Sequence, residues 1–124
     1  KLIGMGKAIL GARILVMGMT FKENVADIRN SKVVDIINEL KDFGVEVDVV
    51  DPYADPEEVK KMYGFRLIEK PLGNYDAVVV AVAHDAYQGL DEKYFKSLTC
   101  DKAVLVDVKG MYRDKIHELK YWSL

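Results

Sequence analysis

The chain has 124 residues, of which 50% are apolar and 31% charged, so it is long enough for one globular domain with its own core. Its net charge of -2 and its pI of 5.7 give no electrostatic reason to expect nucleic acid or an anionic membrane as a partner. The single cysteine, Cys100, excludes an intrachain disulfide and a thiolate metal cluster, and it favours a reducing, cytoplasmic compartment.

The first half of the chain predicts two strand–helix units. Residues Arg13–Met17 are apolar and β-branched enough for a buried strand, and apolar residues from Val33 to Leu40 then recur at helical spacing. Ser31 or Asn30 is the expected N-cap of this helix. A second strand follows over Val45–Val50, and Asp55-Pro56 opens a second helix that ends near Gly64.

The second half predicts three more strands and one helix. Phe65–Ile68 is expected to form a short edge strand, and Asp76–Ala83, the most hydrophobic run, a central strand. A third helix is expected over Asp91–Leu98 and a last buried strand over Ala103–Val108. The apolar run Ala77–Ala83 is far shorter than the roughly 20 residues of a membrane span.

Strands and helices alternate, which predicts an α/β fold: a doubly wound, mainly parallel, Rossmann-like sheet of about five strands with helices on both faces. We expect the strand order 3-2-1-4-5, because the two halves then diverge beside the first strand and open a crevice at its carboxyl end. The loops that reach this crevice are Gly18–Asn30, Ala83–Tyr87 and Asp107–Met111.

The loop from Gly18 to Ser31 is the strongest candidate for a ligand site. It joins a buried strand to a helix, where free backbone N–H groups and the helix dipole favour anions, and it carries Lys22 and Arg29. A dinucleotide-binding turn needs the glycines of G-x-G-x-x-G, and only Gly18 is present. The loop is therefore not a free-standing NAD site, and Phe21 suggests contacts to a nucleotide or sugar.

Each charged candidate also has a purely structural interpretation. Lys22, Arg29 and Lys109 are either phosphate ligands or solvated surface charges, and Asp27 pairs with a neighbouring cation or caps the helix. Asp51 stands where a dinucleotide fold has its ribose-binding acid, but we favour a turn-forming Asp-Pro because the glycine fingerprint is missing.

Two further residues suggest catalysis at first sight. His84 follows the central strand and faces the expected crevice, but no nucleophile is evident nearby, so a hydrogen-bonded loop histidine is favoured over a general base. Cys100 follows the third helix, away from the crevice loops, which favours an inert, half-buried thiol over a nucleophile.

Several motifs resemble a known family. The pattern F-K-x-x-x-x-D-x-R-x-S after the first strand, then D-P, A-V-x-H-D and D-V-K-G, resembles the C-terminal domain of the UDP-glucose/GDP-mannose dehydrogenase family. The resemblance covers Ala12 to about Leu124. Details such as AVAHDAY, DVKGMY and YWSL look most like the bacterial UDP-N-acetylhexosamine 6-dehydrogenases of polysaccharide synthesis.

The resemblance implies a larger enzyme. Residues 1–12 would be the end of a linker or helix between domains, and residues 13–124 the UDP-sugar-binding domain. An N-terminal Rossmann domain would bind NAD, and a central helical domain would form a homodimer. The reaction would oxidise the sugar 6-hydroxyl to a carboxylate in two hydride transfers, through a thioester on a cysteine in a G-x-C-x-P-K-D segment. That segment is absent here, so the resemblance implies no catalytic residue in this chain and no activity of the chain alone.

Carried over by motif position, Phe21, Lys22 and Lys109 would contact the UDP-sugar. Arg29 would reach across the interdomain cleft to NAD, and Asp27 would support the loop. Lys109 stands where many UDP-glucose enzymes have an arginine, and a lysine lacks the bidentate fork. No metal site, nucleic acid or membrane is implied.

Two alternatives stand beside this interpretation. A receiver-like signalling domain shares an α/β sheet and a lysine after the last strand, but it needs an acidic pair directly after the first strand, where this chain has Met19, Thr20 and Phe21. A stand-alone nucleotide-binding regulatory module is the other.

Overall fold

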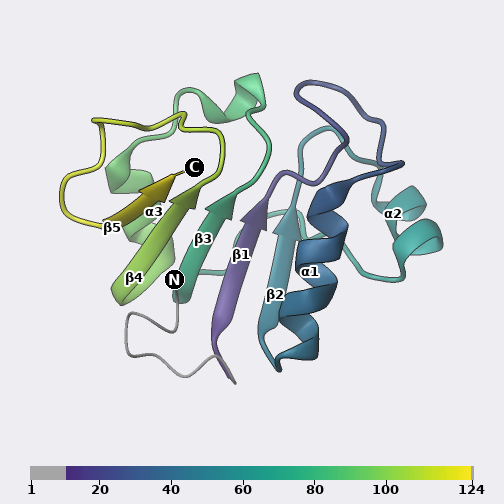
Figure 1. Cartoon of the computed structure of the whole chain (residues 1–124), viewed down its shortest axis with the longest axis horizontal. Helices are drawn as coiled ribbons and strands as arrows, with labels where there is room; N and C mark the ends of the chain where they lie inside the picture. The colour runs from purple at the N-terminus through teal and green to yellow at the C-terminus, as the bar shows by residue number, and fades with distance from the viewer. Residues whose placement is uncertain (1–10, 124) are drawn as a thin grey trace.

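Five parallel strands form one sheet in the order β2-β1-β3-β4-β5 in the computed structural model, which describes residues 11–123 (Figure 1). The expected linker over residues 1–12 falls largely outside this range. The strands are β1 (Arg13–Met17), β2 (Glu46–Val50), β3 (Tyr75–Val80), β4 (Thr99–Asp107) and β5 (Lys120–Ser123). The helices are α1 (Lys32–Asp42), α2 (Pro56–Tyr63), the 3₁₀ turn η2 (Asp85–Tyr87) and α3 (Glu92–Leu98).

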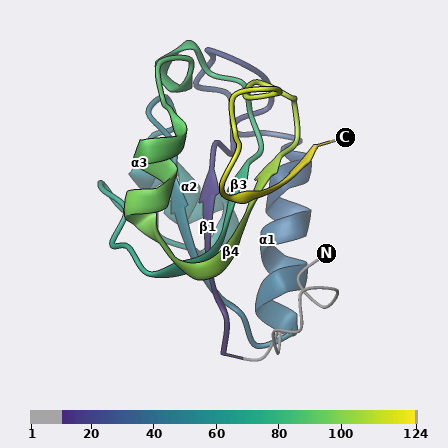
Figure 2. The same cartoon turned by 90° about the vertical axis from the view of Figure 1, so that its left-hand side faces the viewer.

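Helices α1 and α3 lie on opposite faces of the sheet, and each face has its own core (Figure 2). Side chains alternate along β1, so that Ile14 and Val16 pack under α1 while Leu15 and Met17 face the α3 side. All four are at most 2% exposed, which explains why the sequence of β1 is apolar throughout rather than alternating. The doubly wound parallel fold is therefore confirmed.

The helix ends follow local sequence signals. Asp55 caps α2 by accepting a hydrogen bond from Glu57 N–H at 2.9 Å, Pro56 opens the first turn, and Gly64 ends the helix with φ +80°. Asp91 caps α3 in the same way through Tyr94 N–H. No helix among residues 11–123 is long and apolar enough to cross a membrane.

The expected edge strand at Phe65–Ile68 is wrong. This segment is irregular and makes one backbone hydrogen bond to β2, from Ile68 N–H to Val49 C=O at 2.9 Å. Phe65 and Leu67 are buried because they cover the core beneath α1, so their spacing reflects packing and not a strand ladder.

The fifth strand lies at the other edge, where β5 pairs with β4. Numbered along the chain, the order is therefore 2-1-3-4-5 instead of 3-2-1-4-5. The arrangement of the four strands that both descriptions share is as expected, with β2 and β3 flanking β1 and β4 beyond β3. The predicted crevice at the carboxyl end of β1 is thus retained.

Candidate functional site

The loops after β1, β3 and β4 meet around a pocket of about 370 Å³ at the carboxyl ends of the strands. We call it the lysine pocket. It lies on the α1 side of the sheet. The loops after β1 and β4 contribute residues from the ranges expected at the crevice, whereas the loop after β3 contributes Ala81 and Val82, which precede the expected range Ala83–Tyr87 because β3 ends at Val80. Its lining residues are Thr20, Phe21, Lys22, Glu23, Asn30, Lys32, Val33, Ile36, Ala81, Val82, Val108 and Lys109.

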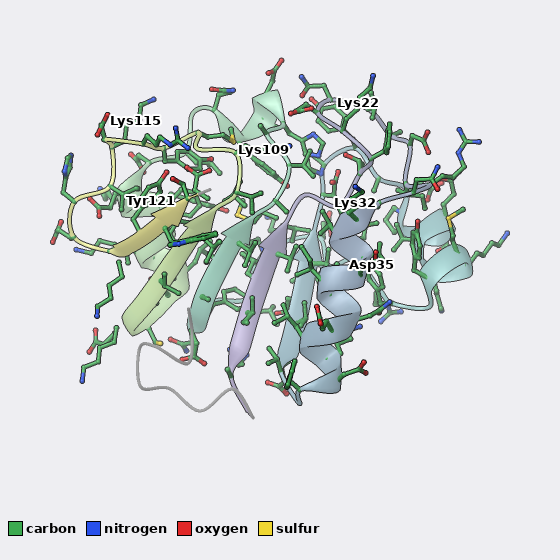
Figure 3. The ribbon with its side chains drawn as sticks, in the orientation of Figure 1. Lys22, Lys32, Asp35, Lys109, Lys115 and Tyr121 are labelled. Carbon is green, nitrogen blue, oxygen red and sulfur yellow. The ribbon has the colours of Figure 1, made fainter. Side chains whose placement is uncertain are left out.

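Three lysines from separate positions converge on this pocket. Lys22 comes from the β1 loop, Lys32 from the first turn of α1 and Lys109 from the β4 loop, and all three are exposed (Figure 3). Glu23 is the single carboxylate among the lining residues, so the pocket carries excess positive charge. Such a cluster suits a phosphate or diphosphate group.

The N-terminus of α1 adds to this positive potential. The N-cap residue Ser31 makes no side-chain bond to the helix, because its hydroxyl donates to Met19 C=O at 2.6 Å. The first turn of α1, which begins at Lys32 beside the pocket, therefore receives no cap from the Ser31 side chain. Its N–H groups and the helix dipole favour an anion there.

Phe21 gives the pocket an aromatic wall. The residue is 54% exposed, which is unusual for a phenylalanine, and its backbone N–H donates to Asp27 C=O at 2.7 Å. Val33 and Ile36 of α1 supply apolar surface beside it. An exposed ring next to cations suits a ligand that combines a planar or sugar ring with phosphates.

Gly18 makes the turn out of β1 possible. Its φ is +93°, and a Cβ built on it would lie 2.8 Å from Val82 Cβ and 3.0 Å from Val82 N. The β1 and β3 loops therefore approach each other so closely that only a glycine fits without displacement.

Asp51 is a buried structural residue and not a ribose ligand. Its side chain is 0% exposed. Oδ1 accepts from Tyr53 N–H at 2.8 Å and Ala54 N–H at 3.1 Å, which forms the turn after β2. Oδ2 accepts from Met19 N–H at 2.7 Å and so fixes the start of the β1 loop. The sequence interpretation of Asp51 as a turn-forming residue is confirmed.

His84 is likewise enclosed and bonded to the β1 loop. The residue is 0% exposed, its Nε2 lies 3.0 Å from Asp51 Oδ2, and its Nδ1 accepts from Asn24 N–H at 3.0 Å. With both ring nitrogens occupied and no surface exposed, the ring does not reach the pocket as a general base. The interpretation as a hydrogen-bonded loop histidine is confirmed.

Asp107 organises the loop that carries Lys109. This carboxylate is 0% exposed and accepts from Met111 N–H at 3.0 Å and Tyr112 N–H at 2.7 Å. Gly110 within the loop has φ +72°. Asp51 and Asp107 thus play the same part at the ends of β2 and β4, where each uses its oxygens to hold a loop of the site.

Arg29 and Asp27 form a separate feature. Arg29 Nε and Nη2 donate to Asp27 Oδ1 and Oδ2 at 3.0 and 3.1 Å, and this pairing lowers the pKa of Asp27 and raises that of Arg29. The Arg29 side chain is 74% exposed and lines a different pocket of about 680 Å³, with Glu58, Lys61 and Met62. The structure therefore brings Phe21, Lys22 and Lys109 together and places Arg29 apart from them.

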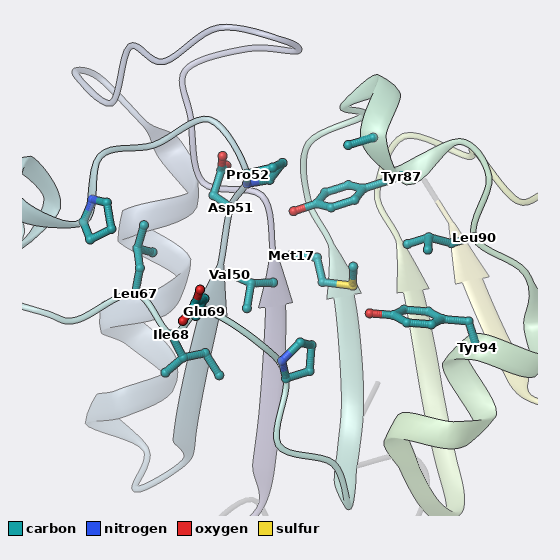
Figure 4. A pocket seen from close by; sticks show the side chains of 13 residues that line it. Met17, Val50, Asp51, Pro52, Leu67, Ile68, Glu69, Tyr87, Leu90 and Tyr94 are labelled. Carbon is teal, nitrogen blue, oxygen red and sulfur yellow. The ribbon is translucent and has the colours of Figure 1, made fainter.

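A third pocket of about 640 Å³ lies on the α3 side of the sheet (Figure 4). Tyr87 and Tyr94 extend into it toward Val50, and burial raises the pKa of Tyr87. Of the residues that line it, Asp51 and Glu69 are acidic and none is a lysine or arginine. This pocket therefore does not suit a phosphate.

Cys100 lies near the amino end of β4, whereas the lysine pocket lies at the carboxyl end of that strand. Its thiol donates to Asp76 Oδ1 at 3.2 Å. Within residues 11–123, no group of three or more His, Cys, Asp or Glu side chains is arranged to hold a metal ion. Neither a thiol nucleophile nor a metal centre is thus available at the lysine pocket in this part of the chain.

Sequence reasoning missed Lys32, Asn24 and Asp107. Lys32 directly follows the S of the F-K-x-x-x-x-D-x-R-x-S pattern, so its place at the first turn of a helix beside an anion loop was a usable signal. The roles of Asn24 and Asp107 depend on contacts between loops that no local pattern indicates.

Comparisons with known proteins agree with this geometry. Residues 15–114 match the model of the UDP binding domain of the UDP-glucose/GDP-mannose dehydrogenase family. The chain is 39% identical over 111 residues to UDP-N-acetyl-D-glucosamine 6-dehydrogenase from Pseudomonas aeruginosa, which covers 89% of the chain and 26% of that protein. It is 42% identical over 112 residues to protein CapL from Staphylococcus aureus, with coverage of 90% and 26%.

The solved structure of NDP-N-acetyl-D-galactosaminuronic acid dehydrogenase from Methanosarcina mazei Go1 shares the fold, with a TM-score of 0.84 and 23% identity over 99% of the chain and 26% of that protein. The chain thus spans about a quarter of the length of these proteins. The matches confirm the resemblance found in the sequence, and they support neither a receiver-like domain nor a stand-alone regulatory module.

Proposed function

This chain belongs to the UDP-glucose/GDP-mannose dehydrogenase family as its UDP-binding domain, and on that premise we propose that the lysine pocket binds the diphosphate of a UDP-sugar. Lys22 and Lys109 contact the phosphates from two sides, and Phe21 packs against a ring of the ligand. The observation that carries the proposal is the convergence of these three residues, far apart in sequence, on one pocket at the carboxyl ends of the strands.

The charge of its lining residues distinguishes the lysine pocket from the two other pockets described above. A diphosphate needs several cations, and the lysine pocket offers three against one carboxylate, next to a helix N-terminus that the Ser31 side chain leaves uncapped. The pocket on the α3 side has acids and no lysine or arginine in its lining. In the pocket beside α2, the guanidinium of Arg29 is already paired with Asp27.

For the full-length protein we propose an NAD-dependent oxidation of a UDP-N-acetylhexosamine at its 6-hydroxyl, in the supply of polysaccharide precursors. The described residues do not fit the cofactor by themselves, because the loop after β1 has Gly18 but no further glycine of a dinucleotide turn. NAD would be held mainly by another domain, with Arg29 as the contribution of this one and Asp27 as its support. The catalytic cysteine would also lie elsewhere, in a protein that forms a homodimer.

The different roles proposed for Lys22, Lys109 and Arg29 follow from their positions. Lys22 and Lys109 line the lysine pocket, whereas Arg29 is highly exposed on the outer part of the β1 loop, where another domain could close on it. Lys109 acts as a point charge, because an ammonium cannot form the two parallel bonds of a guanidinium.

The test is calorimetric titration of the 124-residue chain with UDP and with uridine. UDP should bind and uridine should bind much more weakly, since the cations recognise the diphosphate. Lys22→Ala and Lys109→Ala should each weaken UDP binding about tenfold or more, on the scale of a charge-assisted hydrogen bond. Lys115→Ala serves as the control, because Lys115 is exposed on a loop outside the pocket (Figure 3). Equal binding of UDP by all three variants and the parent chain would refute the proposed site.

The isolated chain should fold but neither reduce NAD nor oxidise a UDP-sugar. Turnover of UDP-N-acetylglucosamine with NAD by the purified chain would refute the assignment of the catalytic groups to other domains.

A further inference from the structure

The segment that presents Phe21 and Lys22 is bonded at both of its ends to one buried imidazole. His84 Nδ1 accepts the backbone N–H of Asn24 at 3.0 Å, two residues after Lys22. On its other side, Nε2 lies 3.0 Å from Asp51 Oδ2 and 3.3 Å from Thr20 Oγ1, one residue before Phe21. The imidazole thus contacts both ends of the segment Thr20–Asn24.

The hydrogen-bonding groups around the ring define its tautomer. A backbone N–H can only donate, so Nδ1 carries no proton, and the neutral ring therefore has its proton on Nε2, facing the carboxylate of Asp51. The ring is packed between Tyr53 and Tyr87, with centroid distances of 4.6 and 5.4 Å. Its position and its tautomer are both determined by its surroundings.

A second bond runs in the opposite direction between the same two loops. Asn24 Oδ1 accepts the backbone N–H of Asp85 at 2.7 Å, so Asn24 and the His84–Asp85 pair hold each other at two points. Asn24 has φ +59°, a conformation that asparagine tolerates better than most residues. Thr20 Oγ1 also donates to Lys22 C=O at 2.8 Å, which closes the segment on itself.

We propose that His84 is a positioning residue for the UDP-sugar, and that its two nitrogens have separable roles. Nδ1, together with Asn24, fixes the conformation in which Phe21 and Lys22 face the lysine pocket. Nε2 adds a side-chain donor to the buried Asp51 carboxylate, which also accepts backbone N–H groups, and it supports the stability of the domain. This inference rests on the proposed function, because Phe21 and Lys22 matter only if the pocket binds that ligand.

Two isosteric substitutions separate the roles. In His84→Asn the amide oxygen lies near the position of Nδ1 and can accept from Asn24, while Asp51 loses the side-chain donor Nε2 and keeps its backbone donors. In His84→Gln the amide reaches the position of Nε2 and can donate to Asp51, while Asn24 N–H loses its acceptor. UDP affinity is measured by calorimetry and stability by thermal unfolding, both on the 124-residue chain.

We expect the two readouts to diverge. His84→Gln should weaken UDP binding tenfold or more with a small loss in Tm, and His84→Asn should bind UDP within about threefold of the parent chain despite a larger loss in Tm. A merely structural histidine would give affinity losses that follow the Tm losses. That pattern, or unchanged affinity in His84→Gln, would overturn the proposal.

Asn24→Gly provides a second variant if an imidazole substitution prevents folding. Glycine keeps the positive φ but removes the bond to Asp85, so UDP affinity should fall severalfold. Asn74→Gly is the matched control, because Asn74 has φ +58° and lies exposed on the loop before β3. Equal UDP affinity in Asn24→Gly, Asn74→Gly and the parent chain would also overturn the proposal.

Lys22→Ala distinguishes a failure of this inference from a failure of the proposed function. If Lys22→Ala weakens UDP binding while both His84 variants bind normally, the positioning role fails and the pocket assignment stands. If Lys22→Ala also binds UDP normally, the pocket assignment itself fails.

Discussion

Tyr121 on β5 donates its hydroxyl to Asp107 Oδ2 at 2.5 Å, and it thereby ties the edge strand to the loop that carries Lys109. Asp107 is fully buried at the end of β4, and the same oxygen accepts from Tyr112 N–H. Burial and the bond to Asp107 raise the pKa of Tyr121 to about 12, so the hydroxyl remains a donor throughout the physiological pH range.

Tyr121→Phe should therefore destabilise the domain by about 1.5–3 kcal/mol, the usual contribution of a hydrogen bond to a charged group. Urea unfolding measures the change. Tyr94→Phe is the control, since the Tyr94 hydroxyl points into the pocket on the α3 side (Figure 4), and its loss should change the free energy of unfolding little. Equal effects of the two substitutions would contradict a specific role for the Asp107 bond.

Lys32 should contribute to UDP binding although it lies outside the family motif. Lys32→Ala removes one of the three cations of the lysine pocket and should weaken UDP binding roughly two- to tenfold, because the side chain is exposed and partly screened. The effect should shrink when titrations are repeated at high salt. Lys115→Ala should have no such effect, and an unchanged affinity in Lys32→Ala would leave Lys32 as a solvated charge.

Gly18→Ala should be among the more damaging single-methyl additions. The substitution imposes a cost of about 1–2 kcal/mol for the positive φ, and a further cost of about 1–3 kcal/mol for crowding. The crowding is against Val82, because a Cβ on residue 18 would lie 3.0 Å from the backbone N of Val82. Gly64→Ala separates the two costs, because Gly64 also has a positive φ of +80° but its Cβ would meet nothing within 4 Å. Equal destabilisation in both variants would mean that the contact with Val82 does not matter.

Most of the sheet was predictable because its strands are short apolar runs with clear ends. Strands β1 to β4 and the three α-helices follow such runs and their Asp, Pro and Gly punctuation. β5 was missed because Lys120–Ser123 contains a lysine and a serine and no buried run, and its stability comes from pairing with β4 and from Tyr121. Pairing between distant segments leaves no local periodicity to detect.

The candidate site was likewise predictable in part and unpredictable in part. The convergence of Phe21, Lys22 and Lys109 was predictable, since loops after neighbouring parallel strands meet at one edge of the sheet. The contact between His84 and Asn24 was not, because it depends on which backbone N–H of one loop lies opposite a side chain of another. A histidine after a buried strand indicates a loop position, but the sequence does not say what the ring holds.

Glu92 should make the stability of the domain depend on pH at the acidic end. Its carboxylate accepts backbone N–H bonds from Leu119, Glu118 and His117, foremost that of Leu119 at 2.9 Å, and these bonds lower the pKa of Glu92. Because the pKa of Glu92 is lower in the folded state, its stabilisation of the domain is complete at pH values above its pKa in the unfolded chain, which is about 4.3. It is lost as the pH falls through the folded-state value.

The stability difference between the parent chain and Glu92→Gln should therefore be constant from pH 7 to about pH 5 and should shrink below about pH 4. Thermal unfolding of both proteins across this range measures it. A difference that stays the same down to pH 3 would show that the ionised carboxylate is not what holds residues 117–119.

Arg29 and Lys22 should differ in the ligand that they affect in the full-length protein. Arg29 holds both oxygens of Asp27 with its planar fork, is largely exposed, and lies outside the lysine pocket. Arg29→Lys keeps the charge but loses the fork, so it should weaken NAD use and overall turnover and leave UDP affinity within about twofold. Lys22→Ala should do the opposite and raise the KM for the UDP-sugar far more than that for NAD. Calorimetry of both full-length variants with UDP and with NAD decides between the assignments, because a loss of UDP affinity in Arg29→Lys with normal NAD affinity would reverse the roles of the two cations.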